Sequence, residues 1–172
     1  MNCSQSVQPL ILAIDIFLKF QENIKSASPH TLRAYSLDLK QAFRDQEAEE
    51  WTEDSLWQAV REAQLKWGSL SLASRNRKSA TLMSFLGFLQ SKGWIESSLA
   101  HRVFSPKVPK KIPHFISVDE VLSIMQSFVT SPSDDEKLLF LFLYGSGLRV
   151  SEACAIKWSD LQCSQRVVRI RG

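Results

Sequence analysis

Arg149 and Glu152 are the residues of this 172-residue chain with the clearest capacity for chemistry. They lie in the segment Tyr144-Gly-Ser-Gly-Leu-Arg-Val-Ser-Glu152, in which the glycines are expected to end one helix before Arg149 begins another. A guanidinium and the backbone N–H groups of a helix start both favour an oxyanion such as phosphate. Glu152, one turn later, is placed to hold the arginine by a charge-assisted hydrogen bond. On spacing alone, an ordinary surface ion pair three residues apart is the simpler interpretation.

A second candidate for function is a block of positive charge. Residues 71–111 contain 8 Lys and Arg against one acidic residue, Glu96, a net charge of +7. Residues 1–70 carry a net −3 and residues 112–172 a net −1. Such a block attracts a polyanion. Nucleic-acid binding and a solvated helix face joined to a basic linker are both compatible with the charge alone.

Four amphipathic helices are expected to position this basic block. Apolar residues at three- and four-residue spacing predict a first helix over 7–18 and a second over 29–44, with Ser28 as N-cap. A third helix is expected over 56–67, and a fourth over 72–92, ending at Gly93. A short further helix is expected over 95–103. The fourth helix has an apolar second half for packing and a basic first half, residues 74–79, that is available to a ligand.

A proline-rich segment divides the chain. Residues 104–114 contain three prolines and three lysines, which favours an extended linker. Beyond it, Ser117 and Ser133 are each followed three residues later by Glu and are predicted helix N-caps. Residues 138–144 are apolar throughout, so their helix is expected to be buried. Residues 166–171 predict the first strand of a small sheet. We expect a mainly α chain with domains over 1–103 and 115–172 and a linker over 104–114.

The composition excludes several classes of protein. It is ordinary for a globular chain, with 44% hydrophobic and 23% charged residues. The longest apolar run has seven residues, far fewer than the ~20 of a membrane span, and no membrane partner is expected. Cys3, Cys154 and Cys163 lack metal-ligand spacing, so we expect no metal and no disulfide framework, with Cys154 a buried small hydrophobe. The cysteine number favours the reducing cytoplasm.

Four segments carry a resemblance to a known family. Residues 147–161, Gly-Leu-Arg-Val-Ser-Glu-Ala-Cys-Ala-Ile-Lys-Trp-Ser-Asp-Leu, resemble the first active-site box of the tyrosine recombinases, the phage integrase family, and most closely its bacterial Xer branch. Residues 31–39 and 74–88 resemble the second and fourth helices of its N-terminal core-binding domain. Residues 106–120 resemble its interdomain linker and the start of its catalytic domain. The resemblance implies an N-terminal helical-bundle, SAM-like core-binding domain, then the helical start of a catalytic domain with one C-terminal β-strand.

The resemblance also implies a chemistry. The family cuts DNA with a tyrosine that attacks the scissile phosphate and forms a 3′-phosphotyrosyl link, with no metal and no nucleotide cofactor. Arg149 matches the first catalytic arginine, which binds non-bridging phosphate oxygens, and Glu152 matches the acidic residue that seats it. No position matches the family's catalytic lysine, its His-x-x-Arg box or its tyrosine nucleophile. Tyr35 and Tyr144, the two tyrosines of the chain, are predicted core residues. We therefore expect a truncated member that binds DNA and is inactive in cleavage.

The expected DNA contacts follow from the same resemblance, since helices two and four of the core-binding domain approach DNA in this family. They lie on those helices and in the linker: His30, Thr31, Arg33, Ser74, Arg75, Arg77, Lys78, Lys107, Lys110 and Lys111. The Lys and Arg side chains are expected to contact phosphates rather than bases. For each residue the alternative is simple exposure to solvent.

The implied partners are a double-stranded DNA recombination site, further recombinase protomers in a tetramer on that DNA, and a DNA translocase. The implied processes are DNA integration and recombination, including chromosome dimer resolution, in the cytoplasm at the nucleoid. Two alternatives stay open: a non-catalytic helical DNA-binding or regulatory protein, and a truncated pseudo-recombinase that modulates an intact partner. A lysine, a His-x-x-Arg box and a tyrosine in the downstream reading frame would decide for an enzyme.

Overall fold

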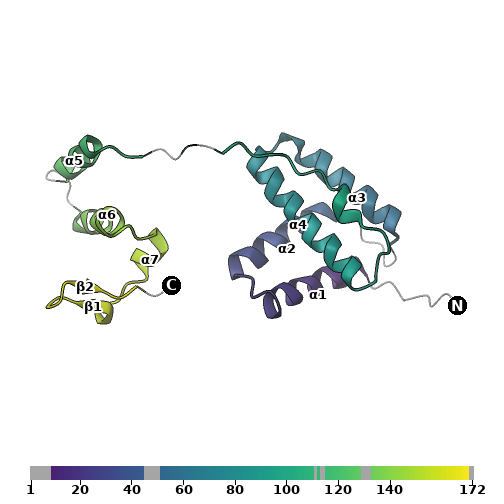
Figure 1. The fold of residues 1–172 in the computed structure, drawn as a ribbon, viewed down its shortest axis with the longest axis horizontal. Coiled ribbons are helices and arrows are strands. Elements are labelled where there is room, and N and C mark those ends of the chain that lie inside the picture. The colour runs from purple at the N-terminus through teal and green to yellow at the C-terminus, as the bar shows by residue number, and fades with distance from the viewer. Residues whose placement is uncertain (1–8, 45–50, 111, 113–114, 129–132, 171–172) are drawn as a thin grey trace. The chain divides into compact units, whose positions relative to one another are not determined.

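The computed structural model describes residues 9–44, 51–110, 112, 115–128 and 133–170. The chain divides into two compact units, Met1–Lys110 and Lys111–Gly172. This division falls inside the proline-rich segment 104–114. Each unit has its own set of helices (Figure 1).

The described part of the first unit contains the helices that carry the basic block. These are α1 (Leu10–Asn23), α2 (Pro29–Ala42), α3 (Glu53–Lys66) and α4 (Leu72–Ser91), with the 3-10 turns η1 (Trp67–Ser69) and η2 (Leu99–Arg102). Hydroxyl side chains of Ser28, Thr52 and Ser71 cap the starts of α2, α3 and α4. The four predicted helices are confirmed. The helix α1 runs five residues further than predicted, and Phe20 in that extension packs against the core.

Aromatic and leucine side chains from these helices form one core. Phe17 of α1 is fully buried and contacts Tyr35, Phe85 and Phe88, with ring centroids between 5.4 and 5.7 Å apart. Aromatic side chains bury large areas, so this cluster joins α1, α2 and α4 into one body. The apolar second half of α4 is buried as expected, and its basic first half lies toward the other end of the helix. In that first half Arg77 is exposed and Arg75 partly exposed, whereas Lys78 and Ser79 are buried.

The described part of the second unit contains shorter elements. They are α5 (Val118–Ser127), α6 (Asp134–Ser146), α7 (Val150–Cys154), the 3-10 turn η3 (Trp158–Asp160) and the strands β1 (Leu161–Gln162) and β2 (Val167–Val168). Ser117 and Glu120 form the predicted capping box of α5. Ser133 caps α6 by accepting from the N–H of Glu136. The start signals in the sequence therefore predicted both of these helices.

The strand predicted over 166–171 is the second strand of a hairpin rather than the first of a sheet. β1 and β2 pair antiparallel, with Leu161 opposite Val168 and Gln162 opposite Val167. The turn comes before β2, and Arg166 in that turn has a φ of +54°. Because β1 has two residues, it is too short to show the alternation that identifies a strand.

The burial predicted for α6 is wrong. Among the described residues of the second unit, Val121 and Asp160 are the buried ones, and none of them lies in α6. Leu138 and Leu141 are 54% and 52% exposed. A helix that is apolar on all sides is buried only where neighbours surround it. Here Phe140 packs on Phe128 with ring centroids 5.4 Å apart, which covers one side.

Two further residues of this unit are more exposed than predicted. Tyr144 is 52% exposed and stacks on Phe140, and Cys154 is exposed. Both were predicted to be buried, but a sequence pattern does not identify which other residues cover an apolar face.

Candidate functional site

Arg149 is presented at the N-cap of α7, directly after a glycine turn. Gly147 ends α6 with a φ of +64°, a left-handed conformation that glycine adopts without strain. The guanidinium Nη1 of Arg149 donates to Glu152 Oε1 at 2.7 Å, and the backbone N–H of Arg149 donates to Glu152 Oε2 at 2.8 Å. The Arg149 side chain is 82% exposed and that of Glu152 is 21% exposed. The arginine is thus held on one side and open to an anion on the other.

Glu152 is a charged holder at neutral pH. The donated backbone N–H of Arg149, and then its guanidinium, keep the pKa of Glu152 below its ordinary value. Because the carboxylate is ionised, the hydrogen bond to the guanidinium is charge-assisted. The predicted hydrogen bond between these two residues is therefore present.

Three of the expected DNA contacts, one on α4 and two on α2, lie in the first turns of these helices. His30 and Thr31 occupy the first turn of α2, and Ser74 the first turn of α4, where the positive end of the helix dipole favours phosphate. The backbone N–H groups of Thr31 and Ser74 already donate to the capping hydroxyls of Ser28 and Ser71. Arg33 is exposed, and Arg75 is partly exposed. These positions leave the side chains accessible to a ligand, as the DNA-contact prediction requires.

Arg77 and Lys78 meet at Asp38, a carboxylate that sequence reasoning did not single out. Asp38 lies on α2 and is 1% exposed. It accepts two hydrogen bonds from the guanidinium of Arg77, one from Lys78 Nζ at 2.8 Å and one from Thr81 Oγ1 at 3.0 Å. The signal that could have revealed it is a charged residue beside Leu39 on the packing face of a predicted helix. The cluster ties the middle of α2 to the first half of α4.

The expected contact between Lys78 and DNA does not match its position in the fold. Lys78 is 7% exposed, and its Nζ donates to Asp38 and to Gln41 Oε1 at 2.8 and 2.7 Å. The same nitrogen lies 4.7 Å from the centre of the Trp67 ring. Lys78 shares its helix face with Leu82, one turn along, and points inward, whereas the Arg77 side chain is 51% exposed. The correction is that Lys78 is an interior charge.

The start of the predicted linker is fixed to the helices by polar side chains. The backbone carbonyl of Phe104 accepts from Gln64 Nε2 at 2.6 Å and from Ser79 Oγ at 2.8 Å. Asn76 Nδ2 donates to Ser105 Oγ and to the carbonyl of Pro106 at 3.1 and 3.0 Å. We call residues 104–106 the linker root. Sequence reasoning missed it because a polar residue inside a basic run, such as Asn76, is expected to face solvent.

The lysines of the linker follow this root. Lys107 and Lys110 are exposed, and Lys111 lies outside the described residues. Arg75 lines a shallow hollow together with Gln64 and Pro106, next to the root. The fold therefore brings an arginine of α4 close to the point where the lysine-bearing segment begins.

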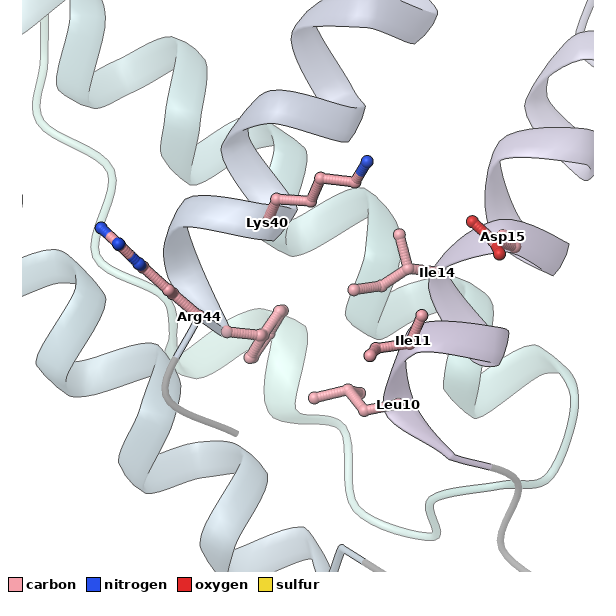
Figure 2. A pocket seen from close by; sticks show the side chains of 7 residues that line it. Leu10, Ile11, Ile14, Asp15, Lys40 and Arg44 are labelled. Atoms are coloured by element: carbon pink, nitrogen blue, oxygen red, sulfur yellow. The ribbon is translucent and has the colours of Figure 1, made fainter. Parts of the chain in front are cut away.

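A pocket of about 270 Å³ lies between α1 and the C-terminal end of α2. Figure 2 shows Leu10, Ile11 and Ile14 of α1 directed toward α2, with Lys40 on α2 and Arg44 just after its end. Its lining contains no pair of carboxylates and no nucleophile beside a base. Its apolar side chains, two cations and the single carboxylate of Asp15 do not form a catalytic arrangement.

Other types of site are not found in the described part of the chain. There, no three His, Cys, Asp or Glu side chains gather as ligands for a metal ion. Nor does any helix in the described ranges have both the length and the hydrophobicity of a membrane span. The candidate residues are thus arginines, lysines and helix starts.

Comparison with known protein families identifies both units. The phage integrase N-terminal SAM-like domain matches residues 14–93, which include most of α1 and all of α2, α3 and α4. The phage integrase family domain matches residues 114–172. The chain belongs to the phage integrase family. The first match contains the Asp38 cluster and the second contains Arg149.

Curated relatives of this integrase-family chain include proteins named tyrosine recombinase XerC. The protein from Thermodesulfovibrio yellowstonii is 32% identical over 163 residues, which cover 91% of this chain and 52% of the relative. The protein from Myxococcus xanthus is 34% identical over 174 residues, which cover 97% of this chain and 56% of the relative. The chain therefore spans about half the length of the curated relatives it matches.

A solved structure has the same fold. It is a lambda integrase dimer bound to a COC′ core site, similar with a TM-score of 0.68 over 94% of this chain and 48% of that chain. The sequence identity is 22%, so the likeness concerns the fold alone. It confirms the predicted mainly α architecture of a SAM-like bundle followed by the helical start of a second domain.

Proposed function

We propose that this chain is the DNA-binding N-terminal portion of a site-specific tyrosine recombinase that acts in full length through a 3′-phosphotyrosyl intermediate. The observation that carries the proposal is the exposed, glutamate-held Arg149 in a phage integrase family chain. The relatives named tyrosine recombinase XerC support the same reaction class.

Arg149 supplies charge stabilisation in this proposal. A guanidinium stays ionised and matches two phosphate oxygens at once. Negative charge grows on those oxygens as the phosphate passes through its pentacovalent transition state. A fixed donor aimed at developing charge typically lowers the barrier by about 3–4 kcal/mol. Glu152 holds the guanidinium in place before the substrate arrives, so the side chain loses less orientational freedom when the phosphate binds.

The first unit is the DNA clamp. In the proposed domain assignment, residues 1–103 form the core-binding domain, 104–114 the linker and 115–172 the first part of the catalytic domain. The clamp uses the exposed Arg33 and Arg77 and the partly exposed Arg75, with Lys107 and Lys110 following the DNA backbone. The partners are duplex DNA and further recombinase protomers. Chromosome dimer resolution, a DNA translocase partner and a cytoplasmic, nucleoid-associated location complete the proposal.

The salt dependence of duplex binding tests the clamp. The wild-type chain is expected to bind a labelled 30-base-pair duplex of mixed sequence, with each phosphate contact adding about 0.9 to the slope of log K against log salt. Replacing Arg33, Arg75 and Arg77 with Ala should lower this slope by about 2 to 3. A control variant with Ala at Lys25, Arg61 and Lys92 loses the same charge from other exposed positions. Equal slopes for the two variants would contradict the clamp.

A suicide-substrate assay tests the catalytic part of the proposal. A nicked duplex traps a phosphotyrosyl adduct when a protein contains both the nucleophile and the residues that activate the scissile phosphate. This chain is expected to bind the nicked duplex and form no covalent adduct, because Tyr35 is packed against the core and Tyr144 precedes the arginine. An adduct on denaturing gels would contradict this assignment. A downstream reading frame without a lysine, a His-x-x-Arg box and a tyrosine would favour the regulatory alternative.

A further inference from the structure

We propose that Asp38 and Lys78 form a buried holder that positions Arg77 as a phosphate contact. The proposal rests on the binding of duplex DNA by the first unit, and it assigns a role to two side chains that DNA does not touch. Asp38 and Lys78 are both buried, whereas the side chain of Arg77 is 51% exposed. The cluster therefore has an interior part and a single outward-facing cation.

The carboxylate of Asp38 is saturated with donors. Oδ1 accepts from Arg77 Nη2 and Lys78 Nζ at 2.9 and 2.8 Å, and Oδ2 accepts from Arg77 Nη1 and Thr81 Oγ1. A carboxylate has about four lone-pair sites, so none is left over. The two parallel bonds to Arg77 fix the plane of its guanidinium as well as its position. Its other N–H groups remain for an anion outside.

Lys78 explains how a buried carboxylate leaves Arg77 positive. Arg77 and Asp38 alone would form a neutral pair with little attraction for phosphate. The second cation gives the cluster a net charge of +1, and its ammonium is itself held by Gln41 Oε1 and the Trp67 ring. The interior charge is thus balanced by Asp38, and the excess lies at the exposed guanidinium.

The cluster also fixes two helices to one another. Asp38 and Gln41 lie on α2. Their partners Arg77, Lys78 and Thr81 lie on α4. His30 and Thr31 lie about 10–12 Å from Asp38 along α2, at a rise of 1.5 Å per residue. One carboxylate therefore couples the phosphate-facing half of α4 to the helix that carries the other expected contacts.

A mutant cycle measured by DNA affinity tests this role. Asp38→Asn combined with Lys78→Met removes the holder while the net charge of the cluster stays at +1. Arg77→Ala should weaken binding of the mixed-sequence duplex about tenfold in the wild-type chain, as expected for a hydrogen bond to a charged group. It should weaken binding about twofold or less in the double variant, because Arg77 there is no longer oriented. Arg61→Ala is the charge-matched control and should cost the same in both backgrounds.

The cycle separates positioning from a merely structural role. A tenfold effect of Arg77→Ala in both backgrounds would overturn the proposal. If the double variant does not fold, the DNA affinity of Arg77→Lys tests the proposal with Asp38 and Lys78 both in place. Lysine keeps the charge but lacks the two-pronged fork, so the proposal expects Arg77→Lys to bind nearly as weakly as Arg77→Ala. Wild-type affinity for Arg77→Lys would overturn it.

The failure of this inference differs from the failure of the proposed function. If the wild-type chain does not bind the duplex, the DNA clamp itself is wrong. If the wild-type chain binds and Arg77 is independent of Asp38, the clamp stands and the holder is wrong. Lys78→Met alone should weaken binding about threefold, since Asp38 then neutralises Arg77. Unchanged affinity in that variant would overturn the part assigned to Lys78.

Discussion

Two arginines in this chain are exposed and held by a carboxylate, but the carboxylates differ in burial. The side chain of Asp38 is 2% exposed and that of Glu152 is 21% exposed. A charge pair in a low-dielectric interior interacts more strongly than one near water. Arg77 is therefore fixed firmly within a folded bundle, whereas Arg149 sits in a weaker local arrangement that a bound phosphate would complete.

The burial of Asp38 predicts a large effect on stability. Asp38→Ala leaves Lys78 as an unpaired interior cation, which should destabilise the first unit by about 3–5 kcal/mol. Urea unfolding followed by circular dichroism measures this change. Asp38→Asn with Lys78→Met removes both charges and should recover most of the loss. If Asp38→Ala and the double variant unfolded at the same urea concentration, the buried cation would not be the cause.

The pKa of Glu152 gives a second prediction at this scale. The pKa of Glu152 is lower in the folded chain than its ordinary value. The bonds between Glu152 and Arg149 therefore contribute fully to stability above about pH 4.3, and this contribution is lost as the pH falls through the lowered pKa. A carboxyl NMR titration should show a pKa of Glu152 below the ordinary value for a glutamate. In Arg149→Ala the pKa should rise only part of the way, because the first cause is the backbone N–H, which remains. A full return to the ordinary value would contradict that order of causes.

Residue type alone could not assign Arg77 and Lys78 correctly. The two cations are adjacent in the sequence, and each adds the same charge to the basic block. Helical periodicity puts Lys78 on the face of Leu82, but a lysine on an apolar face is stable there only if a carboxylate opposes it. The partner, Asp38, is forty residues away. Sequence analysis therefore predicted Arg149 with Glu152, a local pair, and missed the long-range cluster.

At the scale of elements, the linker root determines where the basic segment leaves the first unit. Helix starts were predictable because the N-cap and its partner are three residues apart, as at Ser28 and Ser117. The capping box of α3 was missed because Ser55 takes the place of the usual Glu or Gln. The root could not be predicted, since Gln64 and Asn76 reach it from separate helices.

Removing Asn76 should loosen this root. Asn76→Ala deletes both hydrogen bonds to Ser105 and Pro106, while Gln64 and Ser79 still hold Phe104. Hydrogen exchange of a peptide covering residues 103–108 should become several-fold faster in the variant. Gln90→Ala, an exposed amide at the far end of α4, is the matched control and should leave that peptide unchanged. Equal exchange in wild type and Asn76→Ala would mean that Gln64 and Ser79 suffice.

At the scale of the whole molecule, the two units differ in how completely they bury their apolar residues. The first has a core with Phe17, Leu39, Val60 and Phe85 at 0% exposure, and the second buries one hydrophobic residue, Val121, among those described. Apolar periodicity predicted the helices of the first unit and N-cap signals predicted α5 and α6, since both kinds of signal depend on the local chain. The apolar run 138–144 led to an overestimate of the burial of α6, because a run of apolar residues does not identify what covers them.

This difference predicts two levels of local stability within one chain. Segments with few buried contacts open at a low free-energy cost, whereas core helices open only on global unfolding. Hydrogen exchange of the whole chain should therefore be slow in α1, α3 and α4 and at least a hundredfold faster in α6, which has no buried residue. The duplex used above should slow exchange in the first turns of α2 and α4 if they face DNA. Protection of α6 equal to that of α4 in the free chain would show that its exposed leucines are covered in solution, and the low stability assigned to the second unit would be wrong.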